Sequence, residues 1–141
     1  MIRTIQTTFR GKHTMNDYSN FFIKHKNINS AFTNIILTCR NILVSNNIRI
    51  VDEVSSILPI NGFNTPDGFT MAFLLDESHL SLHSYTNSDL VRGDIIGKLA
   101  LDLFTCSPNP LNHYNTVRDL NKFIIENYDA VLDNSQTINR F

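Results

Sequence analysis

Three short segments carry residue types that could do chemistry. Glu77-Ser78-His79 falls between two apolar runs, His83 lies in a run of alternating polar residues, and Cys106 ends another alternating run. A carboxylate, a hydroxyl, an imidazole and a thiol in one small chain suggest nucleophilic or acid–base chemistry. A strand-end cysteine is usually a packing residue, and a strand histidine is usually only hydrogen-bonded. No single one of these residues therefore identifies a site.

Length and composition narrow the class of protein. The chain has 141 residues, 42% apolar and 18% charged, with a formal net charge of -1. These values predict a single domain over residues 1–141 with its own hydrophobic core. The balance of charges argues against a nucleic-acid or membrane partner, and no apolar run reaches the ~20 residues that span a bilayer. Two cysteines make no disulfide framework, so we expect a cytoplasmic protein, and we expect no metal.

The hydrophobic pattern predicts the elements that must position these residues. A helix is predicted over 27–44, with Cys39 on its apolar stripe as a core residue, and a second helix over 115–128. Strands are predicted at 8–18, 48–60, 69–75, 79–85 and 98–106, with connections at 61–68 and 86–97. Two helices against a mainly antiparallel sheet indicate an α+β fold, a two-layer sandwich with the helices packed on one face.

Three blocks of sequence, in order, carry a family resemblance. They are Pro66-Asp67-Gly68-Phe69-Thr70, Asp76-Glu77-Ser78-His79-Leu80-Ser81-Leu82-His83 and Leu101-Asp102-Leu103-Phe104-Thr105-Cys106. Together they resemble the bacterial-type S-adenosylmethionine decarboxylase proenzymes, a pyruvoyl-dependent family. The resemblance covers residues 66–106, and three blocks in register are more specific than any one motif.

The resemblance implies autocatalytic cleavage of a zymogen between Glu77 and Ser78. The products would be a β chain, residues 1–77, and an α chain, residues 78–141, that begins with a pyruvoyl group made from Ser78. This covalent cofactor would form a Schiff base with S-adenosylmethionine and act as the electron sink for decarboxylation, giving the aminopropyl donor for polyamine synthesis such as spermidine biosynthesis.

The resemblance also assigns roles to three further residues. His83 matches the processing base, and Thr70 stands where the family has a serine that assists processing. Cys106 matches the proton donor, and a thiol with the ordinary pKa of about 8.5 is mostly protonated at pH 7 and can supply that proton.

The hairpin geometry limits which bond His83 can act on. A hairpin of 68–76 with 79–85 would pair Thr70 with Tyr85 and Ala72 with His83, so that Thr70 and His83 become diagonal neighbours on one face. His83 lies five residues beyond Ser78, roughly 16 Å along an extended strand. Either 78–82 is a tight turn, or Thr70 and His83 act on the bond of a partner subunit. We favour a homodimer with active sites at the interface, which the resemblance also implies.

Departures from the family pattern bear on the substrate. Tyr85 replaces a tryptophan as a stacking surface, and Asn87 replaces a glutamate that would bind ribose, with Asp89 near enough to substitute. Phe63 is the second candidate stacking ring. Three functions therefore compete: an S-adenosylmethionine decarboxylase, a pyruvoyl-dependent arginine or ornithine decarboxylase, and an unprocessed, non-enzymatic binding subunit.

Overall fold

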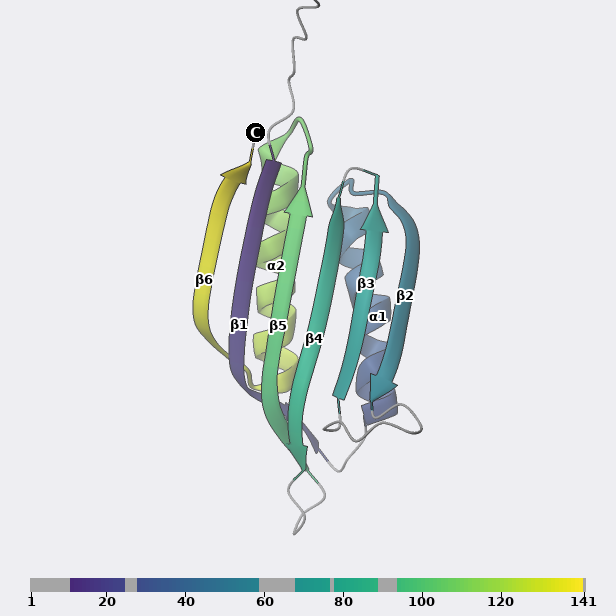
Figure 1. Cartoon of the computed structure of the whole chain (residues 1–141), viewed down its shortest axis with the longest axis vertical. Helices are drawn as coiled ribbons and strands as arrows, with labels where there is room; N and C mark the ends of the chain where they lie inside the picture. Colours follow the sequence, from purple (N-terminus) through teal and green to yellow (C-terminus); the bar gives the residue numbers. More distant parts are fainter. Residues whose placement is uncertain (1–10, 25–27, 59–67, 77, 89–93, 141) are drawn as a thin grey trace, which may run out of the picture.

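The computed structural model describes residues 11–24, 28–58, 68–76, 78–88 and 94–140. Figure 1 shows the described elements along the chain. In order they are β1 (Gly11–Ile23), α1 (Ile28–Ser45), β2 (Ile50–Leu58), β3 (Gly68–Leu75), β4 (His79–Ser88), β5 (Ile95–Thr105), α2 (Pro110–Tyr128) and β6 (Val131–Arg140).

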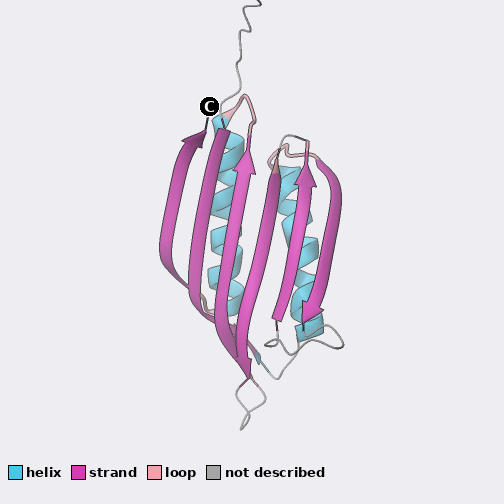
Figure 2. Cartoon of the chain, in the orientation of Figure 1, coloured by secondary structure: helices cyan, strands magenta, loops and turns pink. Residues whose placement is uncertain are grey.

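The described strands form one six-stranded sheet in the order β2-β3-β4-β5-β1-β6. Every neighbouring pair in this sheet is antiparallel. Both helices lie behind the sheet in Figure 1, so the face toward the viewer has no helix on it. Figure 2 shows the same two layers by type of element. The prediction of a two-layer α+β sandwich with helices on one face is confirmed.

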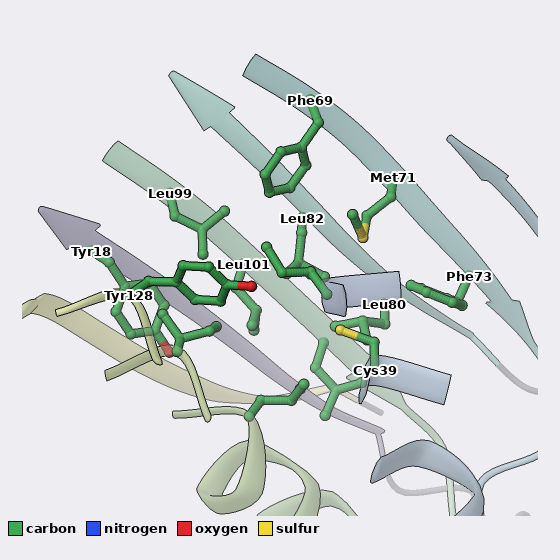
Figure 3. Close-up of a cluster of buried hydrophobic side chains, with 14 of the residues drawn as sticks. Tyr18, Cys39, Phe69, Met71, Phe73, Leu80, Leu82, Leu99, Leu101 and Tyr128 are labelled. Atoms are coloured by element: carbon green, nitrogen blue, oxygen red, sulfur yellow. The ribbon is translucent and has the colours of Figure 1, made fainter. Parts of the chain in front are cut away.

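The core lies between the sheet and the two helices, because strand residues alternate between the two faces. Figure 3 shows the side chains from neighbouring strands that meet those of the helices. The predicted core residue Cys39 is among them and is 1% exposed, and burial raises the pKa of its thiol to about 12. The largest fully buried strand residues are Tyr18, Phe21, Phe69, Phe73, Leu80, Leu82, Leu99, Leu101 and Leu103.

Strand β6 was not predicted from the sequence, which therefore gave five strands instead of the six in the described residues. It forms an edge of the sheet and pairs with β1. Most of its side chains are exposed, so it lacks the apolar alternation by which a half-buried strand is recognised.

Several predicted boundaries were also wrong. The predicted connection 86–97 is shorter, since β4 continues to Ser88 and β5 begins at Ile95. Helix α2 begins at Pro110, five residues before the predicted start, and Asn109 caps it by accepting a hydrogen bond from the Leu111 amide at 3.0 Å. Its first turn carries polar residues and the exposed Leu111, so the apolar pattern starts later than the helix. No described helix is long and apolar enough to cross a membrane.

Candidate active site

The β3–β4 hairpin places the predicted cleavage site at one end of the sheet. Leu75 and Ser78 exchange two backbone hydrogen bonds, at 2.9 and 3.4 Å, so two residues separate the paired positions. The predicted register was therefore wrong by two residues. Thr70 lies directly opposite His83, and Ala72 lies opposite Ser81. The turn has the predicted length of two residues but begins one residue earlier in the chain, which moves every partner by two.

Ser78 and Cys106 line one cavity of about 170 Å³ at this end of the molecule. The cavity lies where the β3–β4 hairpin, the end of β5 and the α1–β2 connection come together, at the top of Figure 1. Its lining residues are Asn47, Ile48, Arg49, Leu75, Asp76, Ser78, Thr105, Cys106, Ser107 and Pro108. Two residues 28 positions apart in the sequence, each singled out for its chemistry, are thus brought to one small site.

The α1–β2 connection contributes a wall of this cavity that the sequence did not indicate. Helix α1 ends at Ser45, and Asn47 takes a left-handed backbone conformation with φ of 60°. The backbone carbonyl of Arg49 then accepts a hydrogen bond from the Asp76 amide at 3.2 Å. The Arg49 guanidinium Nε lies 3.8 Å from the Asp76 carboxylate, with both side chains largely exposed. The sequence predicted only that a helix ends at residue 44 and a strand begins at residue 48, and it assigned no functional role to the residues between them.

The connection after Cys106 is held by its own polar side chains. The Ser107 hydroxyl accepts hydrogen bonds from the Asn109 amide and from the Asn112 side chain, both at 3.3 Å. Cys106 itself is half-buried. The thiol therefore belongs to a short, hydrogen-bonded connection between β5 and α2.

Thr70, His83 and Tyr85 lie on the other face of the sheet, which carries no helix. Thr70 and His83 are half-buried and are direct cross-strand neighbours, a pairing whose Cβ atoms are typically about 4.5–5.5 Å apart. The Tyr85 and His83 rings pack edge to face with centroids 4.4 Å apart and an interplanar angle of 71°. Tyr85 is 56% exposed, so its ring is accessible as a stacking surface.

The structure does not bring His83 to Ser78 of the same chain. Strand β4 is extended and paired on both sides from His79 onward, so a tight turn over 78–82 is ruled out. Five residues of strand separate the two positions by roughly 16 Å. Neighbours of His83 on β4, Leu82 and Ser84, are buried on the helix side, whereas His83 lies on the opposite face.

A glycine allows β3 and β4 to approach closely beside this group. A Cβ atom on Gly68 would lie 2.6 Å from the backbone oxygen of Ser84. The Ser84 hydroxyl accepts a hydrogen bond from the Phe69 amide at 2.8 Å. Ser84 is buried, and its hydroxyl helps to hold the hairpin together.

The remaining predicted residues are described only in part. Glu77, Phe63 and Asp89 lie outside the described residues. Asn87 belongs to β4, where its backbone pairs with Ile96. Among the described residues, no group of three or more histidine, cysteine or acidic side chains is placed to hold a metal ion.

One buried polar residue near the cavity was missed by the sequence analysis. His113 on α2 is 0% exposed, and its ring bonds to Thr105, the residue before Cys106. Burial, together with the charges of Lys12 and His13, lowers the pKa of His113 to about 4, so the ring is neutral near pH 7. Because α2 was predicted to start at 115, His113 was placed outside any element.

A family model described as S-adenosylmethionine decarboxylase matches residues 38–131. The chain belongs to the S-adenosylmethionine decarboxylase family. It is accordingly a decarboxylase, that is, a carboxy-lyase, and the resemblance seen in the three sequence blocks is confirmed. The matched region contains the hairpin, the cavity and the sheet face described above.

Comparison with solved structures agrees on the fold. The adenosylmethionine decarboxylase from Aquifex aeolicus VF5 matches with a TM-score of 0.58 at 16% sequence identity, covering 94% of this chain and 89% of that one. AtUAH, in complex with glyoxylate or with (S)-hydroxyglycine, matches with a TM-score of 0.43 at 8% identity, covering 94% of this chain and 29% of that one. A TM-score this low does not indicate a common fold. No curated protein sequence matches the chain.

Proposed function

We propose that this chain is a self-processing, pyruvoyl-dependent S-adenosylmethionine decarboxylase. The observation that carries the proposal is the shared cavity of Ser78 and Cys106 in a chain of this family. Its product would be the aminopropyl donor for polyamine synthesis.

Self-cleavage would use Ser78 as its nucleophile. The Ser78 hydroxyl attacks the carbonyl carbon of Glu77, and the peptide bond becomes an ester as the acyl group moves from nitrogen to oxygen. A base then removes the α-hydrogen of Ser78, and the Glu77 carboxylate leaves from the β-carbon. The dehydroalanine tautomerises to an imine, which water hydrolyses to a pyruvoyl group and ammonia. Serine is required because its β-oxygen is first the nucleophile and then the leaving atom.

The surroundings of Ser78 fit such a group. Ser78 is half-buried at the start of β4 and lines a cavity with room for a small substrate portion beside it. When formed, the pyruvoyl group supplies the carbonyl that takes up the electrons released as carbon dioxide leaves. Leu75 and Ile48 supply apolar side chains to the walls of the cavity.

Cys106 is the proposed proton donor of the turnover step. It reaches the same cavity as Ser78 from the end of β5. A thiol in this position can act as a general acid and deliver a proton to the carbon that loses carbon dioxide.

His83 and Thr70 are the proposed processing pair, and they would act on a partner subunit. Their cross-strand pairing on the open face suits two groups that act on one bond. The roughly 16 Å of extended strand between His83 and Ser78 of one chain supports action across an interface. A homodimer whose sites are completed by both chains satisfies this requirement, because two-fold symmetry places each chain's pair beside the other chain's bond.

S-adenosylmethionine is the proposed substrate, and Tyr85 is its proposed stacking residue. The exposed Tyr85 ring lies beside His83. A subunit whose His83 reaches the cleavage site of its partner therefore also places its Tyr85 ring beside that site. Phe63, Asn87 and Asp89 remain predicted contacts for adenine and ribose.

Intact mass and labelled carbon dioxide release test this function together. Purified wild-type protein should give fragments 1–77 and 78–141, the second beginning with a ketone that reacts with hydrazines, whereas Ser78→Ala should remain one chain. The processed protein should release carbon dioxide from carboxyl-labelled S-adenosylmethionine. A chain that stays whole after long incubation would contradict the self-processing enzyme and favour the non-enzymatic subunit. Release from arginine or ornithine alone would contradict only the substrate.

A further inference from the structure

We propose that His113 is a positioning residue for Cys106, which it holds through the neighbouring Thr105. This inference rests on the proposed role of Cys106 as proton donor. His113 touches neither the cavity nor the reacting atoms, so it would act only by fixing where the thiol lies.

His113 connects three strands of the sheet by hydrogen bonds. Its Nδ1 lies 2.8 Å from the Thr105 hydroxyl on β5, and its Nε2 lies 2.7 Å from the Thr14 hydroxyl on β1. Thr14 in turn lies 2.8 Å from the Thr137 hydroxyl on β6. The result is a continuous chain of four side chains beneath the end of the sheet that carries the cavity.

The buried ring can satisfy both of its nitrogens only because both partners are hydroxyl groups. A neutral imidazole has one donor and one acceptor nitrogen, and a threonine hydroxyl can serve as either. Burial keeps His113 neutral, with its pKa lowered to about 4. Either tautomer therefore completes the chain of bonds, and the ring is fixed in one place on α2.

Thr105 transmits this restraint to the thiol. It is the last residue of β5, it is buried, and it lines the cavity next to Cys106. On the other side of Cys106, the Ser107 hydroxyl accepts a hydrogen bond from the Asn112 side chain in the first turn of α2. The thiol is thus carried by a short segment anchored at both ends to α2, which is the arrangement expected for a proton donor that must reach one particular carbon.

Two matched variants separate the link to Cys106 from the rest of the network. Thr105→Val removes the hydroxyl next to Cys106, and Thr14→Val removes the hydroxyl at the far side of the same ring. Each change leaves one nitrogen of His113 without its partner, so both should lower the melting temperature to a similar extent. Both keep a β-branched residue on a strand.

Two readouts respond to the position of the thiol and not to stability. The first is the number of turnovers completed before a wrongly protonated, transaminated product inactivates the processed enzyme. The second is the rate at which iodoacetamide alkylates Cys106, measured on its peptide by mass spectrometry, with the buried Cys39 as an internal unreactive reference. We expect Thr105→Val to lower the turnovers per inactivation by about tenfold or more and to change the Cys106 alkylation rate. Thr14→Val should match the wild type in both.

Two further variants test the ring itself. His113→Asn places an amide where Nδ1 lies and can keep the bond to Thr105, whereas His113→Gln places it where Nε2 lies and can keep the bond to Thr14. Rescue by asparagine but not by glutamine supports the proposal. It is overturned if Thr105→Val and Thr14→Val behave alike, or if asparagine and glutamine do. Should the wild type show no decarboxylation, the alkylation rates still decide the positioning role, so failure of the function is distinguished from failure of this inference.

Discussion

The start and the middle of strand β4 differ in how their candidate functional side chains are held. Just before its start, Ser78 shares a cavity with Cys106, whose flanking residues are bonded to α2. Near its middle, His83 and Tyr85 pack on each other on the helix-free face, and Tyr85 is 56% exposed.

This difference indicates that Ser78 and Cys106 need only one chain to be brought together, whereas His83 and Tyr85 need a second chain to reach a site. One chain positions the proposed nucleophile and the proposed proton donor by itself, because the hairpin, the end of β5 and α2 meet at that end of the sheet. The same chain presents the proposed processing base and stacking ring where its own proposed cleavage site is out of reach. A second copy of the chain would unite the two groups.

The largest expected effect comes from mixing two inactive chains. Ser78→Ala lacks the nucleophile and His83→Ala lacks the base, so neither should cleave when expressed alone. When both are expressed together, a mixed dimer contains one complete site if His83 acts across the interface. About half of the His83→Ala chains should then be cleaved, since random pairing of equal amounts places half of them beside a Ser78→Ala partner. Intact mass identifies which chain is cut.

The control for this experiment is a chain that carries both substitutions. When it is mixed with the wild type, it should supply neither the Ser78 nucleophile nor the His83 base. If the His83→Ala chains stay whole in the mixture, His83 acts within its own chain or does not act in processing. The different placement of Ser78 and His83 along β4 would then not reflect a site shared between two chains.

Removal of the thiol should separate processing from turnover. Cys106→Ala should still cleave, because Ser78 and His83 remain, but it should lose about 10²–10⁴-fold in kcat, the usual contribution of a positioned general acid. Cys106→Ser puts a hydroxyl group in place of the thiol and should process equally well. Decarboxylation of labelled S-adenosylmethionine by the fully processed variants measures the effect. Full activity in Cys106→Ala would remove Cys106 from the mechanism.

His113 should make the free energy of unfolding sensitive to acid. Its pKa is lowered from 6.5 to about 4 in the folded chain, first by burial and then by the charges of Lys12 and His13. Between these two values the unfolded chain binds a proton that the folded chain does not. The free energy of unfolding should therefore fall as the pH is lowered from 6.5 to 4, by at most about 3 kcal/mol from this group.

A variant without the imidazole isolates this contribution. His113→Asn cannot titrate, so its urea-unfolding free energy should fall less than that of the wild type across the same pH range, while the other histidines contribute equally to both chains. Parallel curves for the two chains would show that the buried ring does not titrate in this way.

Predictions from the sequence were most accurate where a single sequence feature was enough to define a structural element. The apolar stripe with Cys39 predicted α1, and the three sequence blocks contain Ser78 and Cys106, which share the cavity. The register of the hairpin was missed because it depends on the residue at which the turn begins. A change of two residues in pairing keeps every side chain on its face, so alternation on the two strands does not fix it.

The strand predicted at 8–18 is present as β1 (Gly11–Ile23), but its buried polar residues and His113 were not predicted as core residues. Thr14 and Asn16 on β1 are buried and polar, so the strand lacks the apolar alternation expected of one beside a core. Their partners are His113 on α2, and Asn121 and Ser135, more than 95 residues away in the sequence. Such residues become recognisable as core only when the tertiary partners that satisfy their hydrogen bonds are known.

The smallest expected effect concerns the binding of substrate by Tyr85 on the helix-free face. Stacking on one aromatic ring contributes about 0.5–1.5 kcal/mol beyond burial. Tyr85→Ala should therefore lower kcat/KM for S-adenosylmethionine by about tenfold, a change of about 1.4 kcal/mol in the barrier, and Tyr85→Phe should lower it far less because the ring remains. Arginine and ornithine carry no adenine, so turnover of either would not need the ring. If Tyr85→Ala cleaves normally and keeps full kcat/KM for S-adenosylmethionine, the exposed ring on β4 does not contact the substrate, and only His83 and Thr70 would link that face to the reaction.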